Sequence, residues 1–215
     1  KKELFQGLAV EKMEKDWIQY PILHLDLNTQ KYDRPESLDN ILNMKLNEWE
    51  SLYGSNPVEI GAPLRFLGIV RRAAEQSGRR VVILIDEYDK PLLDVMDMDI
   101  SVQNEYGKMT LEDYNRNLLK GVYSVFKEAD DDLQFVLLTG VTKFSQVSVF
   151  SGFNQPNDIS MDEHYEALCG ITEDELYSTF DEQIKAMAVR YKTTEEGMKY
   201  KLKRKFDGYH FKQRL

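Results

Sequence analysis

The stretch Val81-Val-Ile-Leu-Ile-Asp-Glu-Tyr-Asp-Lys90 decides the fold class of this chain. Its first five residues are aliphatic, and such a run predicts a strand buried on both faces of a sheet. Two adjacent carboxylates, Asp86 and Glu87, follow at once. The stretch therefore allows two interpretations. It is either a buried strand that ends in a solvated turn, or a strand that places acids where a metal ion and a phosphate bind.

Other strands and several helices are predicted on both sides of this strand. Two more strands are indicated, one by apolar–polar alternation and one by a second apolar run, over residues 21–27 and 133–139. Helical periodicity predicts helices over residues 37–52, 62–76, 111–128, 172–191 and 194–205. The helix at 172–191 opens with a capping box, Thr172-Glu-Asp-Glu175. Residues 94–108 mix Asp, Met and Gly and predict a loop or lid.

The order of these elements is β-α-α-β-α-β, followed by helices. Alternating helices and buried strands imply an α/β fold with a mainly parallel sheet between two helical layers, a three-layer α/β/α arrangement. We expect residues 1–165 to form this core and residues 166–215 to form a helical extension.

Composition excludes several classes of protein. Hydrophobic residues make up 42% and charged residues 30% of the 215, which is typical of a globular domain. The formal charge of −9 argues against a surface built to bind nucleic-acid phosphates. The apolar runs are strand-sized, so no membrane span is predicted. With one cysteine, Cys169, and no secretory leader, the simplest expectation is a cytoplasmic protein.

The carboxyl ends of parallel strands are where ligands bind in open α/β sheets. An apolar strand followed by Asp-Glu has the form of a Walker B motif. Asp86, fixed by the strand, would hold Mg²⁺ against the phosphates of ATP, directly or through water. Glu87, one residue further, would orient and deprotonate the attacking water. The alternative is an ordinary polar strand end, and the pattern alone does not decide between the two.

A second strand edge supports the nucleotide interpretation. Thr139, Thr142 and Lys143 follow the strand at residues 133–138, one helical crossover after the acids. Thr142 or Thr139 would contact the γ-phosphate or the catalytic water, and Lys143 would neutralise phosphate charge. An ordinary turn is the alternative here as well.

One expected motif does not occur in the sequence. No G-x-x-x-x-G-K-[ST] is present, and the Gly-Lys pair at Gly107-Lys108 is followed by Met109. The loop that cradles phosphates is thus missing from these residues. The chain also opens with KKELFQGLAV, without Met or a helix cap, so we expect a truncated piece of a longer protein that is inactive by itself.

Four segments together resemble the bacterial predicted AAA-ATPase-like proteins, which are P-loop NTPases often followed by a PD-(D/E)XK nuclease-like domain. They are IDEYDKPLLD (85–94), LLTGVTKFSQVSVFSGFNQPNDIS (137–160), LCGITEDEL (168–176) and FDGYHF (206–211). The resemblance implies that a Walker A loop lies upstream, with ATP and Mg²⁺ as the expected cofactors. It carries over Asp86 and Glu87 as the Walker B pair and Thr142 as a sensor-like residue.

The resulting hypothesis is the core of an ATPase whose hydrolysis drives a conformational switch. The alternative is a non-catalytic interaction module on an ATPase-like scaffold, and a protein partner or self-association is open under either hypothesis. A nuclease motif ending at Lys90 fails, because Tyr88 stands where an acid is required. Asp89 and Lys90 are interpreted as a surface turn before Pro91, and the alternative is that they help to shape the site.

Overall fold

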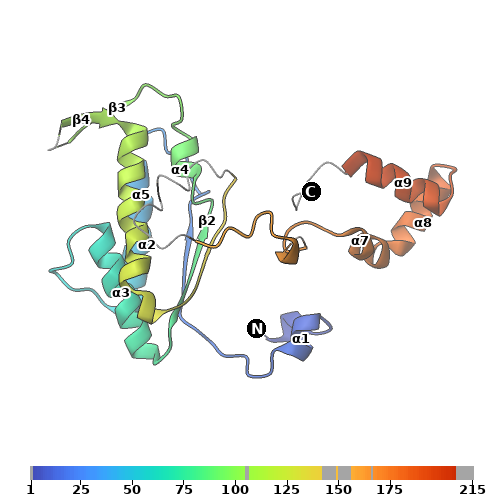
Figure 1. Cartoon of the computed structure of the whole chain (residues 1–215), viewed down its shortest axis with the longest axis horizontal. Helices are drawn as coiled ribbons and strands as arrows, with labels where there is room; N and C mark the ends of the chain where they lie inside the picture. Colours follow the sequence, from blue (N-terminus) through green and yellow to red (C-terminus); the bar gives the residue numbers. More distant parts are fainter. Residues whose placement is uncertain (1, 105–106, 142–148, 150–155, 166, 207–215) are drawn as a thin grey trace. The chain divides into compact units, whose positions relative to one another are not determined.

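A computed structural model describes residues 2–104, 107–141, 149, 156–165 and 167–206 of the chain. Its helices and strands appear in Figure 1. In chain order they are η1 (Lys2–Phe5), α1 (Ala9–Met13), β1 (Ile22–Asp26), α2 (Ser37–Tyr53), α3 (Ala62–Ser77), β2 (Val81–Asp86), α4 (Lys90–Leu93), β3 (Ser101–Asn104), β4 (Gly107–Thr110), α5 (Leu111–Glu128), η2 (Asp130–Asp132), β5 (Leu133–Leu138), η3 (Glu163–Tyr165), α7 (Glu173–Thr179), α8 (Asp181–Arg190) and α9 (Glu195–Phe206). The chain divides into two compact units, Lys1–Gln155 and Pro156–Leu215.

The first unit is built on a parallel sheet of three strands in the order β1-β2-β5. Ile22 is in register with Val82, and Val82 with Phe135, so these side chains lie in one row on one face. Strand β2 is central and hydrogen-bonds on both sides, as its aliphatic composition predicts. The predicted α/β class with a parallel sheet is confirmed.

One face of the sheet carries the hydrophobic core. Leu23, Leu25, Ile83 and Ile85 point to this face and are buried. Helices α2, α3 and α5 pack over it, and Figure 1 shows all three on the same side of β2. Their aromatic residues stack in the centre of the core, at ring-centroid distances of 5.6 Å for Trp49–Phe66 and 5.7 Å for Tyr123–Phe126.

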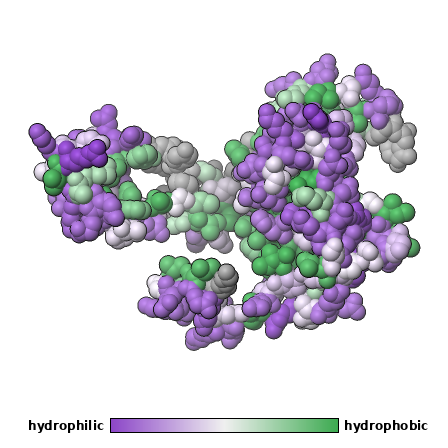
Figure 2. All heavy atoms as spheres, turned by 180° about the vertical axis from the view of Figure 1, so that it is seen from behind, coloured by the Kyte–Doolittle hydropathy of each residue, from purple (hydrophilic) through white to green (hydrophobic). Residues whose placement is uncertain are grey.

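The opposite face differs from the expectation of strands buried on both faces. Ile22 is 56% and Phe135 53% exposed, and His24 is exposed as well. Within the described ranges no helix covers this face, so the second helical layer of the expected three-layer arrangement is not seen there. We call this surface the open face. Figure 2 shows that hydrophobic side chains interrupt the hydrophilic surface of the molecule.

The segment predicted as a loop or lid is a β-hairpin instead. Strands β3 and β4 pair antiparallel, from Ser101 opposite Thr110 to Asn104 opposite Gly107. Val102 packs with Val95 and Leu111 in a small second cluster, which fixes the hairpin to the start of α5. Because only four residues pair on each side, the alternation is too short to stand out in the sequence.

The second unit is helical, as expected for the C-terminal part. The capping box is present: the N–H of Glu175 donates to the Thr172 hydroxyl, and the Thr172 N–H donates back to the Glu175 carboxylate at 2.9 Å. The prediction of a single helix over residues 172–191 is wrong, because two helices, α7 and α8, are separated at Phe180. None of the helices in the described ranges has the length and apolar character that crossing a membrane requires.

Candidate functional site

The two predicted acids lie at the carboxyl end of the central strand β2. Asp86 is the last residue of the strand, and its side chain is exposed. Glu87 has φ of +55°, in the left-handed region that residues with a side chain seldom adopt. The chain therefore turns sharply at Glu87, and Glu87 is half-buried whereas Asp86 is exposed.

Thr139 ties this turn to the neighbouring strand. Its hydroxyl donates a short hydrogen bond to Asp86 Oδ1 and accepts a long one, 3.4 Å, from the N–H of Glu87. Its backbone N–H donates to the Ile85 carbonyl and its carbonyl accepts from the Tyr88 N–H, both at 2.9 Å. Thr139, which was predicted to contact the cofactor, thus binds Asp86, the candidate metal ligand. This hydrogen bond fixes the orientation of the Asp86 carboxylate.

Asp26 is a third acid at this edge, and the sequence analysis did not single it out. It is the register partner of Asp86 on β1, so both side chains lie on the open face at the carboxyl ends of adjacent strands. Asp26 Oδ1 accepts the N–H of Asn28 at 2.8 Å. Only the register in which β1 and β2 pair could have revealed that Asp26 is a neighbour of Asp86, and this register cannot be derived from the sequence.

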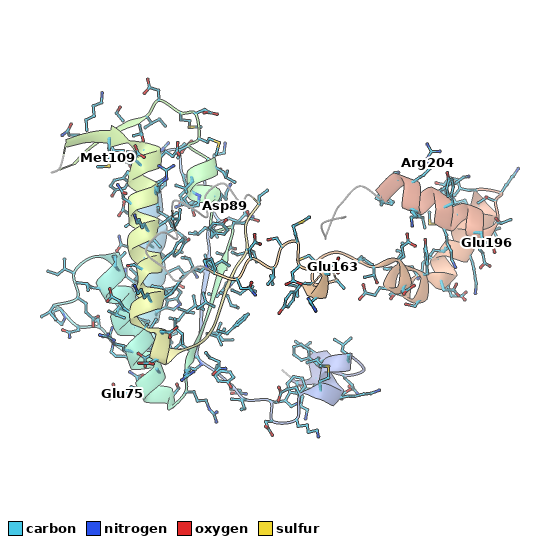
Figure 3. The ribbon with its side chains drawn as sticks, in the orientation of Figure 1. Glu75, Asp89, Met109, Glu163, Glu196 and Arg204 are labelled. Carbon is cyan, nitrogen blue, oxygen red and sulfur yellow. The ribbon has the colours of Figure 1, made fainter. Side chains whose placement is uncertain are left out.

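Asp89 is buried, so its interpretation as part of a surface turn is wrong. Its exposed fraction is 0%, and its carboxylate oxygens accept the N–H of Val141 at 3.3 and 3.0 Å. Figure 3 shows Asp89 near the carboxyl end of β2, below α4. The physical reason is the approach of the chain after β5, which covers the residue and supplies a donor.

The residues after Asp89 form a rigid support. Lys90 and Asp94 make an ion pair at 3.1 Å within the first turn after β2, and Asp94 Oδ2 also accepts the N–H of Tyr32 at 3.2 Å. The Tyr32 hydroxyl donates to the Leu27 carbonyl at 2.8 Å, and burial, with the charges of Asp94 and Asp26, raises the pKa of this phenol. Lys90 is therefore held by Asp94 and has a structural role.

Two of the predicted site residues, Thr142 and Lys143, lie outside the described residues. The roles assigned to them stay predictions. In the part of the chain that the structure describes, three or more His, Cys, Asp or Glu side chains nowhere gather to enclose a metal ion. Two carboxylates at an open strand edge nevertheless fit Mg²⁺, which keeps several waters and takes one or two carboxylates together with substrate phosphates.

These features define a class of α/β protein in which carboxylates end the central strand of a parallel sheet and a neighbouring hydroxyl orients one of them. The chain belongs to the family described as Predicted AAA-ATPase, whose model matches residues 1–150. It is also 35% identical over 181 residues to an Azotobacter chroococcum mcd 1 protein named "Uncharacterized protein in vnfD 5'region". That match covers 82% of this chain and 32% of the relative, so the chain spans about a third of the relative's length. No solved structure matches the chain.

Proposed function

We propose that this chain is part of an ATP-hydrolysing P-loop ATPase and that Asp86 and Glu87 are its Walker B pair. One observation carries the proposal. Asp86 ends the central parallel strand on the open face, and the hydroxyl of Thr139, directly after the adjacent strand β5, fixes its carboxylate. A carboxylate held in this way is already oriented for a metal ion, which is what a preorganised site requires.

The two acids have different tasks in this proposal. Asp86 holds the ion that accompanies the phosphates, with its orientation set by Thr139. Glu87 orients the attacking water and accepts its proton. When bound, Mg²⁺ would neutralise the negative charge on the β- and γ-phosphates. Asp26 adds negative charge beside Asp86 and favours a cation at this edge. Thr142 and Lys143 are proposed as contacts to the γ-phosphate.

The phosphate-binding loop has to come from sequence outside these 215 residues. No G-x-x-x-x-G-K-[ST] occurs in them, and the family relative is about three times as long as the part that matches. The acids lie on the open face. The row of Ile22, Val82 and Phe135 is on the same face of the sheet as Asp26 and Asp86. A segment that covered this face would lie beside the carboxylates. We place the missing loop there.

The test is Glu87→Gln in the full-length protein, measured by ATP turnover and by nucleotide binding. We expect kcat to fall by about 100-fold or more, the usual loss when a general base is removed, while ATP binding is kept. Glu75→Gln is the matched control, because Glu75 is an exposed acid of α3 that Figure 3 shows far from Asp89. Unchanged ATP hydrolysis in Glu87→Gln would contradict the assignment of Glu87 as the general base.

A non-catalytic interaction module is the second candidate, and the open face favours it. A surface that exposes Ile22 and Phe135 beside charged residues is one that a protein partner can cover. The two candidates differ in the upstream sequence. A strand, a glycine loop ending in Lys-Ser or Lys-Thr and a helix support the ATPase, and their absence from the full-length protein supports the module.

A further inference from the structure

The buried carboxylate of Asp89 has no task in the proposed reaction. A buried charge is unfavourable unless hydrogen bonds compensate it, and both oxygens of Asp89 lie within reach of the Val141 N–H. Val141 itself is exposed and follows β5 by three residues. The buried carboxylate of Asp89 thus accepts a hydrogen bond from the backbone of the exposed segment that contains Thr139.

We propose that Asp89 is a positioning residue, which holds the chain after β5 against the turn after β2 and so keeps the Thr139 hydroxyl on Asp86. The inference rests on the proposed function for its catalytic meaning. The contact itself does not, because it is a property of the fold.

The hydrogen bonds around Thr139 show how the positioning works. The backbone of Thr139 is fixed at its N–H by Ile85 and at its carbonyl by Tyr88, each at 2.9 Å. Two residues later, Asp89 fixes the N–H of Val141. Three successive backbone groups are therefore bound to residues 85–89, and the last of them is bound by a side chain that substitution can remove.

Gly140 makes this close approach possible. A Cβ at Gly140 would lie 2.5 Å from Tyr88 Cε1 and 2.8 Å from Asp89 Oδ1, both far below van der Waals contact. Gly140 consequently lies too close to Tyr88 and Asp89 to leave room for a side chain. Any larger residue would push the segment away from the carboxylate that holds it.

The inner side of this contact is rigid. Asp89 directly precedes α4, whose Pro91 carbonyl accepts a hydrogen bond from the buried Asn115 amide of α5 at 2.8 Å. The ion pair of Lys90 with Asp94 closes the same turn. Asp89 is therefore anchored to the core helix α5, and it transmits that rigidity to the exposed strand end that bears Thr139.

The contact is tested first on this chain by amide hydrogen exchange at Val141. Asp89→Ala is expected to speed exchange there by about tenfold or more, because a hydrogen bond to a charged acceptor is lost. Asp89→Asn keeps one acceptor oxygen, should give an intermediate rate, and serves if the alanine variant does not fold. Asp39→Ala is the control, because Asp39 is a half-buried acid bound to Tyr114 on another part of the unit. Unchanged exchange at Val141 in a folded Asp89 variant overturns the proposal.

The catalytic consequence is tested by ATP turnover in the full-length protein. Asp89→Ala should lower kcat on the order of 100-fold, the usual effect of a misplaced catalytic group, with KM for ATP changed by less than about twofold. Asp89→Asn should restore part of the loss. A variant that loses thermal stability but keeps kcat per folded molecule shows a merely structural role and overturns the positioning. Absence of turnover in the unsubstituted protein defeats the proposed function alone, and the exchange rates still decide the contact.

Discussion

Asp26 and Asp86 occupy adjacent positions at the carboxyl ends of two parallel strands, and Thr139 joins Asp86 from the third. The site is thus one row of side chains across the sheet. A row of this kind depends on register, because a shift of one residue on any strand would turn its side chain to the helical face. The hydrophobic side chains that alternate with these polar ones, such as Ile85, hold the register because they are buried in the core.

At the residue scale, Gly140→Ala should destabilise the protein by about 1–3 kcal/mol, the usual cost of overpacking. The added methyl would meet the ring of Tyr88 at 2.5 Å, and Tyr88 is buried with little room to move. Chemical denaturation of the two proteins measures the difference. Gly121→Ala is the matched control, since its Cβ meets only Pro63 Cγ at 3.2 Å and alanine is favoured within helix α5. Equal stability of Gly140→Ala and the parent chain would contradict the close approach.

Burial of Asp89 could not be predicted from its neighbours in sequence. Asp-Lys-Pro is a usual composition for an exposed turn, and the donor that compensates the charge lies 52 residues further on, at Val141. Asp26 was missed for a similar reason, since its nearness to Asp86 depends on strand pairing. The placement of Asp86, Glu87 and Thr139 at strand ends could be predicted, because an apolar run in the sequence precedes them and marks the end of a strand. The roles assigned to them stay predictions.

At the scale of elements, long periodic segments were predicted well and short ones were not. The boundaries of α2, α3 and α5 agree with prediction to within one residue, because each buries a continuous apolar stripe. The β3–β4 hairpin and the break at Phe180 were missed, because four paired residues or one interrupted turn leave little periodicity. The open face was missed because an aliphatic strand has the same kind of sequence whether helices cover one face of its sheet or both.

Helices α2 and α5 are joined by a hydrogen bond that titrates. The Tyr114 hydroxyl donates to Asp39 Oδ2 at 2.7 Å, and burial, this hydrogen bond and the charge of Asp39 raise the pKa of Tyr114 to about 12. The folded protein therefore keeps this proton more tightly than the unfolded chain, whose tyrosine ionises near 10. Stability from this group is fully present below pH 10 and falls as the pH rises towards 12.

The corresponding variant is Tyr114→Phe, which has no proton to lose. We expect the stability of the parent chain relative to Tyr114→Phe to decline between pH 10 and 12, when both are unfolded by urea at a series of pH values. Other buried tyrosines, such as Tyr123, titrate equally in both proteins and cancel in the difference. A difference that stays constant across this range would show that Tyr114 is not held by Asp39.

The second unit offers another titrating contact, at the start of α7. The backbone N–H and hydroxyl of Thr172 both donate to Glu175, and they lower the pKa of that carboxyl. A lowered pKa means that the capping box contributes stability above the ordinary pKa of glutamate and loses it as the pH falls through the lowered value. Thr172→Val should raise the pKa of Glu175 part of the way towards its ordinary range, as measured by carboxyl NMR, because valine removes the hydroxyl donor and keeps the backbone N–H, which is the larger cause. Thr172→Ser should leave the pKa as low as in the parent chain. An unchanged pKa in the valine variant would contradict the capping geometry.

At the scale of the whole molecule, the proposed function would account for the open face, because an ATPase needs a phosphate-binding loop and these 215 residues contain no G-x-x-x-x-G-K-[ST]. The chain matches about a third of its longer relative, and the row of Ile22, Val82 and Phe135 lies on the same face of the sheet as the carboxylates, beside which the proposed ATPase would bind phosphates. We therefore expect a segment of the full-length protein to cover Phe135 and its row. In this chain Phe135→Thr should change the free energy of unfolding by no more than about 0.5 kcal/mol, because the ring is 53% exposed.

In the full-length protein the same substitution should cost about 1–2 kcal/mol more, because covering the ring removes its apolar surface from water. Leu52→Gln is the matched control: Leu52 is 70% exposed at the end of α2, away from the sheet, and its effect should be the same at both lengths. Thermal or urea unfolding of the four variants gives the comparison. Equal costs for Phe135→Thr at both lengths would mean that the open face stays uncovered in the full-length protein. The interaction-module hypothesis would then gain, since this face would be available to a partner.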